Sequence, residues 1–151
     1  MKNLISLLFI SFFIFQFSFA QSNRVSEEEE AYTAVEQMPT WQGCEEMTEE
    51  KDKSSCTYSK VVDFLVSEII YPEKAKKEKI QGTVYVSFII DKTGKVTESK
   101  VLRGVTPEID AEALRIVSLM PDWNPGKQKG ETVNVVYNLP IRFTLKEASA
   151  K

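Results

Sequence analysis

The residue types that carry most enzyme chemistry are sparse in this chain of 151 residues, which has no histidine and only two cysteines. Without histidine, the Ser/His/Asp and Cys/His triads, the HExxH zinc proteases and a histidine general base are all excluded. No pair of carboxylates stands out as an acid and a base, and Gly82, Gly94 and Gly104 fit neither a GxGxxG motif nor a P-loop. We therefore expect no enzyme, no cofactor and no metal site.

The overall charge argues against nucleic acid as a partner. The formal net charge is -3 and the isoelectric point is about 5.2, so the chain has no basic field for a phosphate backbone. The lysines between Glu73 and Lys79 alternate with glutamates, which predicts a solvated helix face rather than an anion site.

The first twenty residues, 1–20, have the pattern of a secretory signal peptide. Lys2 precedes an apolar stretch of 17 residues from Leu4 to Ala20, and Ser18 and Ala20 supply small residues before a cut at Gln21. A retained transmembrane anchor is the competing interpretation, although about 20 residues usually span a bilayer. We predict an exported chain whose signal peptide is cleaved.

Export changes the meaning of Cys44 and Cys56, because an even pair in an oxidising compartment is most simply a disulfide. Closing a loop of about 13 residues is worth roughly 3 kcal/mol in the chain-entropy model. A metal site would need more ligands than two thiols. Segment 21–56 is predicted to be a flexible acidic leader followed by a short lid tethered by the two cysteines, with Trp41 resting on the domain. The run Glu27–Glu30 is expected to be solvated rather than bound to calcium.

Helical periodicity begins after the second cysteine. Apolar residues recur at spacings of three and four, as one buried stripe, at Val62, Leu65, Val66 and Ile69. Thr57 or Ser59 can cap this helix, and Tyr71 followed by Pro72 ends it, because the residue before a proline is disfavoured in the α region. A second short helix is predicted over residues 73–79.

Two strands with period-two alternation follow, at Thr83–Asp91 and at Val96–Arg103. Gly94 lies between them and can adopt the positive φ of a short hairpin loop. The first strand is bulky on both faces, which favours a central position in a sheet. The second strand carries Glu98 and Lys100, charges of the kind found on sheet edges.

A further helix and a long strand complete the domain. The helix is predicted from Thr106, as its cap, to about Pro121. Trp123, expected in the core, precedes a turn at Pro125 and Gly126, and the longest strand then runs over Thr132–Leu145.

This order of elements predicts an α+β fold, a two-layer sandwich in which two main helices pack on one face of a three-stranded antiparallel sheet. The last strand is expected to pair with the first and to lie at an edge, since Pro140 has no N–H and a strand inside a sheet cannot spare that donor. Because the last strand is longer than the first, we expect part of it to have no partner within the domain.

The edge strand is the candidate binding surface. Pro140 should lie at a position whose backbone faces outward, and by alternation the backbone groups of Asn134, Val136, Asn138 and Arg142 face outward too. An unpaired edge of this kind can add a strand from another chain. The alternative is that the proline and the asparagines only protect the edge from aggregation.

A set of motifs in fixed order resembles the C-terminal domain of TonB energy transducers. The similarity extends from about Thr57 to Leu145, within a domain predicted at 57–146 that is followed by a tail at 147–151. The motif residues that carry it are Tyr71, Pro72, Gly82, Gly94, Trp123, Pro125 and Gly126. The two cysteines also resemble a variant in which a Gly-Cys-Glu segment precedes the domain.

The resemblance implies a periplasmic module whose last strand captures the "TonB box" of a TonB-dependent outer-membrane receptor and transmits force to it. Residues Asn134–Phe143 correspond to that strand. Full transducers also have a membrane anchor and a proline-rich spacer, and Ser67–Ile70 replaces a glutamine-rich segment here. We therefore expect an unanchored TonB-like domain that binds strands. The rival is a scaffold in which two copies pair through the last strand and no motor is involved.

Overall fold

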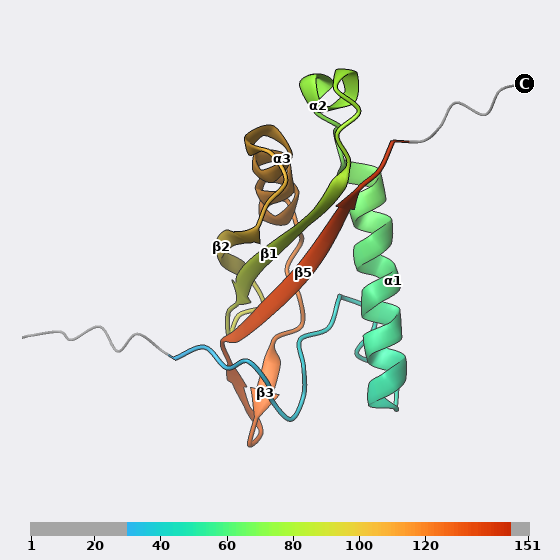
Figure 1. Ribbon diagram of the computed structural model, residues 1–151. Helices are drawn as coiled ribbons and strands as arrows, with labels where there is room; N and C mark the ends of the chain where they lie inside the picture. The colour runs from blue at the N-terminus through green and yellow to red at the C-terminus, as the bar shows by residue number, and fades with distance from the viewer. Residues whose placement is uncertain (1–29, 146–151) are drawn as a thin grey trace, which may run out of the picture.

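The computed structural model describes residues 30–145 of the chain (Figure 1). The predicted signal peptide at 1–20, most of the acidic run and the tail at 147–151 lie outside the described residues. The elements in chain order are α1 (Glu50–Glu68), α2 (Glu73–Lys77), β1 (Gly82–Ile90), β2 (Val96–Arg103), α3 (Pro107–Ser118), β3 (Gly126–Gln128), β4 (Glu131–Val133) and β5 (Val135–Phe143). None of the helices within residues 30–145 combines the length and the apolar character needed to cross a membrane.

Strand β1 is the centre of a three-stranded antiparallel sheet with the order β2-β1-β5. Strand β5 pairs with β1 without a bulge from Gly82 opposite Phe143 to Ile90 opposite Val135. The alternating apolar residues fix this register, because a slip by one residue would turn the buried side chains to solvent. The predicted α+β fold is confirmed, and so is the pairing of the last strand with the first.

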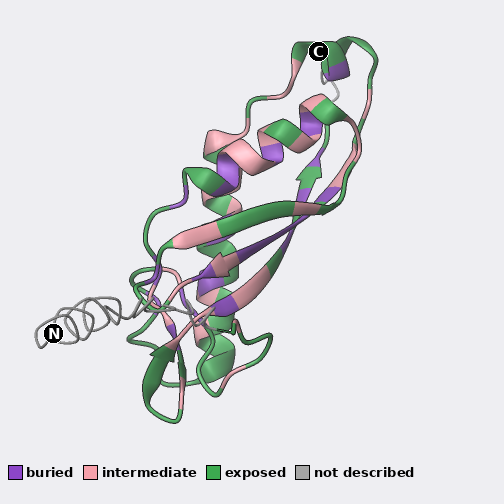
Figure 2. Ribbon diagram, turned by 90° about the vertical axis from the view of Figure 1, so that its left-hand side faces the viewer, coloured by how far each residue is buried: buried purple, intermediate pink, exposed green. Residues whose placement is uncertain are grey.

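Both main helices contribute to one core, which lies on a single face of the sheet. The even positions of β1 from Val84 to Ile90 are buried, as are most odd positions of β5. Helix α1 adds Val61 to this core, and α3 adds Ile109 and Val117. Figure 2 shows buried positions concentrated between the helices and the sheet. Burial of each such side chain stabilises the fold by about 1.5–3 kcal/mol.

Helix α3 begins as its sequence predicts. Thr106 is the N-cap in an extended conformation, and its hydroxyl oxygen accepts a hydrogen bond from the backbone N–H of Ile109 at 3.3 Å. Pro107 occupies the first helical position, where its missing N–H costs nothing.

Helix α1 begins at Glu50, earlier than predicted, so Thr57 and Ser59 are wrong as caps. The N-cap is Glu49, which makes no capping hydrogen bond through its side chain. Thr57 is instead buried inside the helix, where its hydroxyl oxygen accepts a hydrogen bond from the backbone N–H of Trp41 at 3.1 Å. The domain boundary predicted at residue 57 falls within this helix.

The strand predicted over Thr132–Leu145 is divided at Asn134 into β4 and β5. Strand β4 pairs with β3 in a hairpin whose turn residues, Lys129 and Gly130, have φ angles of 52° and 82°. Positive φ at both central positions is typical of a type I′ turn. The expectation that part of the last strand has no partner is therefore wrong, since both pieces are paired.

The described part of the leader, residues 30–49, is held against the domain, so the flexibility predicted for the part ahead of the tethered lid is wrong for these residues. Tyr32, Gln37 and Thr40 each exchange two backbone hydrogen bonds with residues 124–136. These bonds bring the leader beside the β3–β4 hairpin and the first part of β5 (Figure 1).

Candidate functional site

The sheet has two edges, and only one of them is regular. The pairing of β2 with β1 is interrupted by two irregularities, and Glu98 in β2 has a φ of 49°. Glu98 and Lys100 are exposed charges on this edge, as predicted. Bulges and charges discourage an added strand. Strand β5 has neither a bulge nor a break in its pairing, so its edge is the better acceptor.

The even-numbered residues of β5 turn their backbone groups away from β1. The clearest observation is Tyr32, whose N–H donates to the carbonyl oxygen of Asn134 at 2.9 Å and whose carbonyl accepts from the N–H of Val136 at 2.8 Å. Because backbone direction alternates along a regular strand, Asn138 and Arg142 face outward as well. The outward parity predicted from the sequence is therefore confirmed at Asn134 and Val136.

The two ends of this edge differ in whether another part of the chain forms hydrogen bonds with their outward backbone groups. Tyr32 already uses one outward group of Asn134 and one of Val136 as a parallel bridge. Further along, Asn138, Pro140 and Arg142 are exposed. None of the hydrogen bonds among residues 30–145 uses the outward backbone groups of these three residues.

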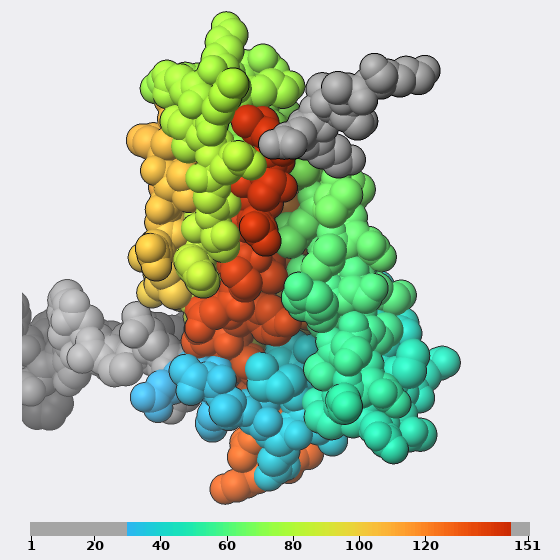
Figure 3. All heavy atoms as spheres, turned by 45° about the vertical axis from the view of Figure 1, so that its right-hand side comes forward, coloured from blue at the N-terminus to red at the C-terminus, as the bar shows by residue number. Residues whose placement is uncertain are grey.

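A groove of about 440 Å³ lies between this exposed half of β5 and helix α1. Tyr58, Val62 and Val66 line it from α1. Pro140 and Arg142 line it from the edge of β5. In Figure 3 the red and orange atoms of β5 are visible between the yellow-green atoms of β1 and the green atoms of α1, and the blue leader lies below.

Tyr71 and Pro72 fix one end of the groove. The hydroxyl of Tyr71 donates a hydrogen bond to the carbonyl oxygen of Ile80, and its ring packs edge-on against Phe143 with the ring centres 5.9 Å apart. Burial raises the pKa of the Tyr71 hydroxyl, which keeps it a donor. Pro72 is the N-cap of α2, and Gly82 opposes Phe143 at the start of β1. The hydrogen bond and the ring contact of Tyr71 thus hold the start of β1 and the end of β5 together beside the groove, which Tyr71 also lines.

Trp123 is the centre of an aromatic cluster and belongs to the core, as predicted. It is 3% exposed, and its ring centre lies 5.2 Å from that of Trp41, 6.4 Å from that of Phe88 and 5.1 Å from that of Tyr137. Its indole Nε1 has no hydrogen-bond partner among residues 30–145. Burial raises the pKa of Tyr137 in the same cluster. Trp41 shows that the leader closes this cluster, in line with its predicted resting place on the domain.

The glycines of the motif stand where a side chain would collide with backbone or core. Gly94 has a φ of +92°, and a Cβ there would lie 1.9 Å from the carbonyl oxygen of Trp123. The N–H of Trp123 donates to the carbonyl oxygen of Gly94 at 2.8 Å. After Pro125, a Cβ on Gly126 would lie 2.6 Å from a methyl carbon of Val135. The turn predicted at Pro125 and Gly126 is wrong, because Gly126 begins β3 and the chain turns at Lys129 and Gly130 instead.

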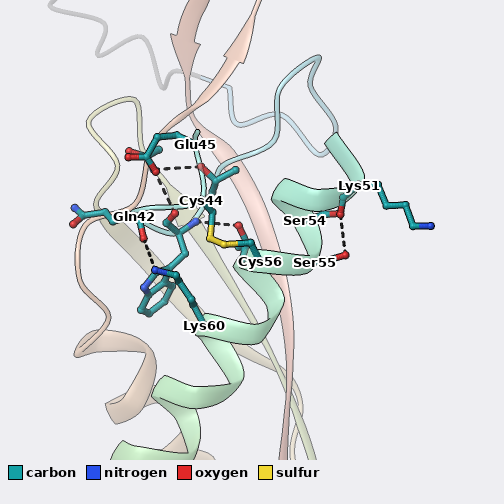
Figure 4. Close-up of a disulfide and its surroundings, with 12 residues drawn as sticks. Gln42, Cys44, Glu45, Lys51, Ser54, Ser55, Cys56 and Lys60 are labelled. Atoms are coloured by element: carbon teal, nitrogen blue, oxygen red, sulfur yellow. Dashed lines mark hydrogen bonds between the residues drawn. A yellow bond between two sulfur atoms is a disulfide. The ribbon is translucent and has the colours of Figure 1, made fainter. Parts of the chain in front are cut away.

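The predicted disulfide is confirmed between Cys44 and Cys56, whose Cα atoms are 5.8 Å apart (Figure 4). Cys44 is fully buried. The Nζ of Lys60 adds a hydrogen bond to the carbonyl oxygen of Gln42 at 3.2 Å. The leader is therefore tied covalently to α1, the helix that forms the far wall of the groove.

Sequence reasoning missed two parts of this site. Tyr32 lies in a leader whose sequence has no helical or strand periodicity, so no pattern indicated that it pairs with β5. Val62 and Val66 were assigned to the buried stripe of the helix, yet they line the groove, and Val66 is 70% exposed. The available signal was Tyr58, which continues their line at a spacing of four residues.

Residues 30–145 thus form a small α+β domain in which a regular sheet edge lies beside an apolar groove. Comparison with known families assigns this domain to one of them. The chain belongs to the family described as Gram-negative bacterial TonB protein C-terminal, whose family model matches residues 67–145, more than half of the sequence.

Several solved structures are similar to the chain. Two are NMR solution structures of Helicobacter pylori TonB-CTD. The first is 32% identical and covers 60% of this chain and 95% of its own, with a TM-score of 0.44. The second is 28% identical and covers 70% and 92%, with a TM-score of 0.46. A structure of HasB CTD is 24% identical and covers 62% and 72%, with a TM-score of 0.33. No curated protein matches the sequence.

Membership in this family indicates where such domains act and in which process they take part. The family consists of periplasmic-type domains that take part in TonB-type transport and interact in general with outer-membrane receptors. Its members are transport and energy-transduction proteins rather than enzymes.

Proposed function

We propose that this chain binds the TonB box of an outer-membrane receptor by adding it as a further strand to the open edge of β5, and so takes part in TonB-dependent transport. The observation that carries this proposal is the hydrogen bonding of Tyr32 to Asn134 and Val136, in which one residue of the leader already pairs with the same edge as an isolated bridge. The neighbouring positions Asn138, Pro140 and Arg142 continue that edge and are exposed.

Strand addition suits a mechanical link. The edge from Val136 to Arg142 offers a guest the carbonyl oxygens of Val136, Asn138 and Pro140 and the N–H groups of Asn138 and Arg142. Each backbone hydrogen bond contributes about 1 kcal/mol net. A pull along the guest strand loads these bonds together, so they resist it as a group.

The test is calorimetric titration of a synthetic TonB-box peptide into the wild type, Asn138→Pro and Asn138→Ala. The outward N–H of Asn138 takes no part in the β1–β5 ladder, so the proline removes one donor for the guest and keeps the ladder. We expect the Asn138→Pro variant to bind about fivefold more weakly, which is the loss of one hydrogen bond of about 1 kcal/mol. The Asn138→Ala variant keeps the N–H and should bind as the wild type does.

Two results would contradict the proposal. One is a peptide that binds both variants of Asn138 equally well. The other is a dimer, detected by light scattering at several protein concentrations, whose formation does not change when the peptide is added. That second result would support the rival scaffold that pairs through its last strand.

The proposal includes export with cleavage after Ala20. Its support is the apolar stretch from Leu4 and the small residues Ser18 and Ala20. N-terminal sequencing of the exported protein should begin at Gln21. An N-terminus at Met1 or Lys2 would instead support an anchored transducer.

A further inference from the structure

Helix α1 carries an apolar line that the core does not use. Tyr58, Val62 and Val66 follow one another at intervals of four residues and face the groove. Tyr58 is 66% exposed and Val66 is 70% exposed. The core contacts of the same helix are made by other residues, of which Val61 is fully buried.

The opposite wall of the groove is of a different kind. It is formed by Pro140, Ile141 and Arg142 at the edge of β5, where the backbone of Pro140 and Arg142 faces outward. A guest in this groove therefore meets backbone donors and acceptors on one side and apolar side chains on the other. A helical segment uses its backbone groups internally, so it could not form hydrogen bonds with the backbone groups of β5. An extended chain satisfies both walls if its side chains toward α1 are apolar.

The spacings of the two walls agree. Residues four apart on a helix rise by about 6 Å along its axis. Every second residue of a strand is about 6.7 Å further along, and its side chain points to the same face. Alternate side chains of an added strand can thus pair in sequence with Tyr58, Val62 and Val66.

We propose that this line on α1 selects the guest, so that the bound segment carries apolar residues at every second position, those that face α1. The inference rests on the proposed strand addition at β5 and goes beyond it, because backbone pairing alone would accept any sequence. Backbone pairing with β5 holds the guest, and contacts with α1 determine which peptides bind.

The probe is a synthetic peptide of about eight residues, with valine at every second position, threonine between and both ends blocked. It is titrated into the full chain as wild type, Val66→Lys and Ser67→Lys. The two variants add the same charge at neighbouring exposed positions, but Ser67 does not line the groove. We expect Val66→Lys to weaken binding of the valine peptide about tenfold and Ser67→Lys to change it less than twofold.

A charge exchange makes the assignment specific. Peptides with aspartate in place of one valine, prepared for each valine position, are titrated into the same variants. One of them should bind Val66→Lys about tenfold more tightly than it binds the wild type. Val62→Thr, which replaces one methyl group by a hydroxyl and keeps the branched shape, is the second variant and should weaken binding of the valine peptide about threefold. Circular dichroism checks that every variant is folded.

The outcomes separate this inference from the proposed function. If an all-threonine peptide binds the wild type as tightly as the valine peptide does, strand addition stands and selection by α1 is overturned. Equal weakening by Val66→Lys and Ser67→Lys also overturns it. If the wild type binds neither peptide nor a TonB-box peptide, the proposed function itself fails.

Discussion

The backbone N–H of Val136 donates to the carbonyl oxygen of Tyr32 at 2.8 Å, so one residue of the leader already pairs with the outer edge of β5. Replacing Tyr32 by proline removes the reciprocal donor to Asn134 and should loosen this bridge. We expect the amide of Val136 to exchange with solvent hydrogen at least about fivefold faster, while the inward amide of Tyr137 stays protected. Tyr32→Ala keeps the backbone donor and is the control. Unchanged exchange at Val136 in Tyr32→Pro would show that the bridge does not protect this edge.

Pro140 interrupts the row of outward donors, because it has no N–H. Pro140→Ala restores one donor to a guest strand without touching the inner ladder. We expect the affinity for a TonB-box peptide, measured by calorimetry, to rise about fivefold, which corresponds to about 1 kcal/mol. Light scattering on the same variant reports whether the restored donor also promotes self-association. An unchanged affinity would mean that the guest makes no hydrogen bond at this position.

Gly94 should tolerate no side chain, because a Cβ there would lie 1.9 Å from the carbonyl oxygen of Trp123 and φ is +92°. We expect Gly94→Ala to lower the free energy of unfolding by about 3 kcal/mol in urea titrations. Gly130→Ala is the matched control, since φ is +82° there but nothing lies within 4 Å of the added carbon. It should cost about 1 kcal/mol from the backbone conformation alone. Equal losses of unfolding free energy in the two variants would show that the positive φ, and not the collision with Trp123, causes the whole effect.

The Cys44–Cys56 disulfide should stabilise the fold by restricting the unfolded chain. The double variant Cys44→Ser/Cys56→Ser should lose about 3 kcal/mol of unfolding free energy. Reducing agent should lower the stability of the wild type to a similar value and leave the double variant unchanged. If reduction lowered the stability of both proteins, the agent would be acting on something other than this bond.

Glu112 should make stability depend on pH in the acidic range. Its carboxylate accepts hydrogen bonds from the guanidinium of Arg115 and from the N–H of Ile70, each at 2.7 Å. Partial burial raises the pKa of Glu112, but the bonds from Arg115 and Ile70 outweigh it and hold the pKa below its usual 4.5. A lowered pKa means that the stabilisation is present above pH 4.5 and is lost as the pH falls through the pKa of the folded state.

Glu112→Gln tests this dependence. The variant should be about 1–2 kcal/mol less stable than the wild type at neutral pH, because charge-assisted hydrogen bonds become neutral ones. The difference should shrink as the pH is lowered from 5 to 3, as followed by urea unfolding at each pH. A difference that stays constant over this range would assign the effect to packing rather than to charge.

The sheet and α3 could be predicted because local pattern and tertiary packing agree there. Strand β1 alternates over its whole length, and Thr106 with Pro107 marks the start of α3 by ordinary capping chemistry. The start of α1 could not be predicted, because its first turns are polar and Glu49 makes no cap through its side chain. The break at Asn134 was hidden, since the apolar parity of Val133 continues into β5 across the hairpin that ends there.

The site was predictable only in part. Because Pro140 has no N–H, its position predicted which residues of the last strand turn their backbone groups away from the sheet. The outward N–H of Val136 agrees with that prediction. The leader gave no local signal, because its order comes from hydrogen bonds to residues distant in sequence and from one covalent bond. The groove depends on how α1 sits beside β5, and single-helix periodicity does not distinguish a line facing a groove from one facing the core.

The order of attachments along the leader gives it a graded response to tension. A pull on the chain ahead of Tyr32 would detach Tyr32 first, then Gln37 and then Thr40, each step breaking a few hydrogen bonds to residues 124–136. Extension would then stop at Cys44, where a covalent link passes the load to α1. The length of chain released before that stop would expose the outward N–H of Val136, so tension on this segment would lengthen the part of the β5 edge that a guest strand can reach.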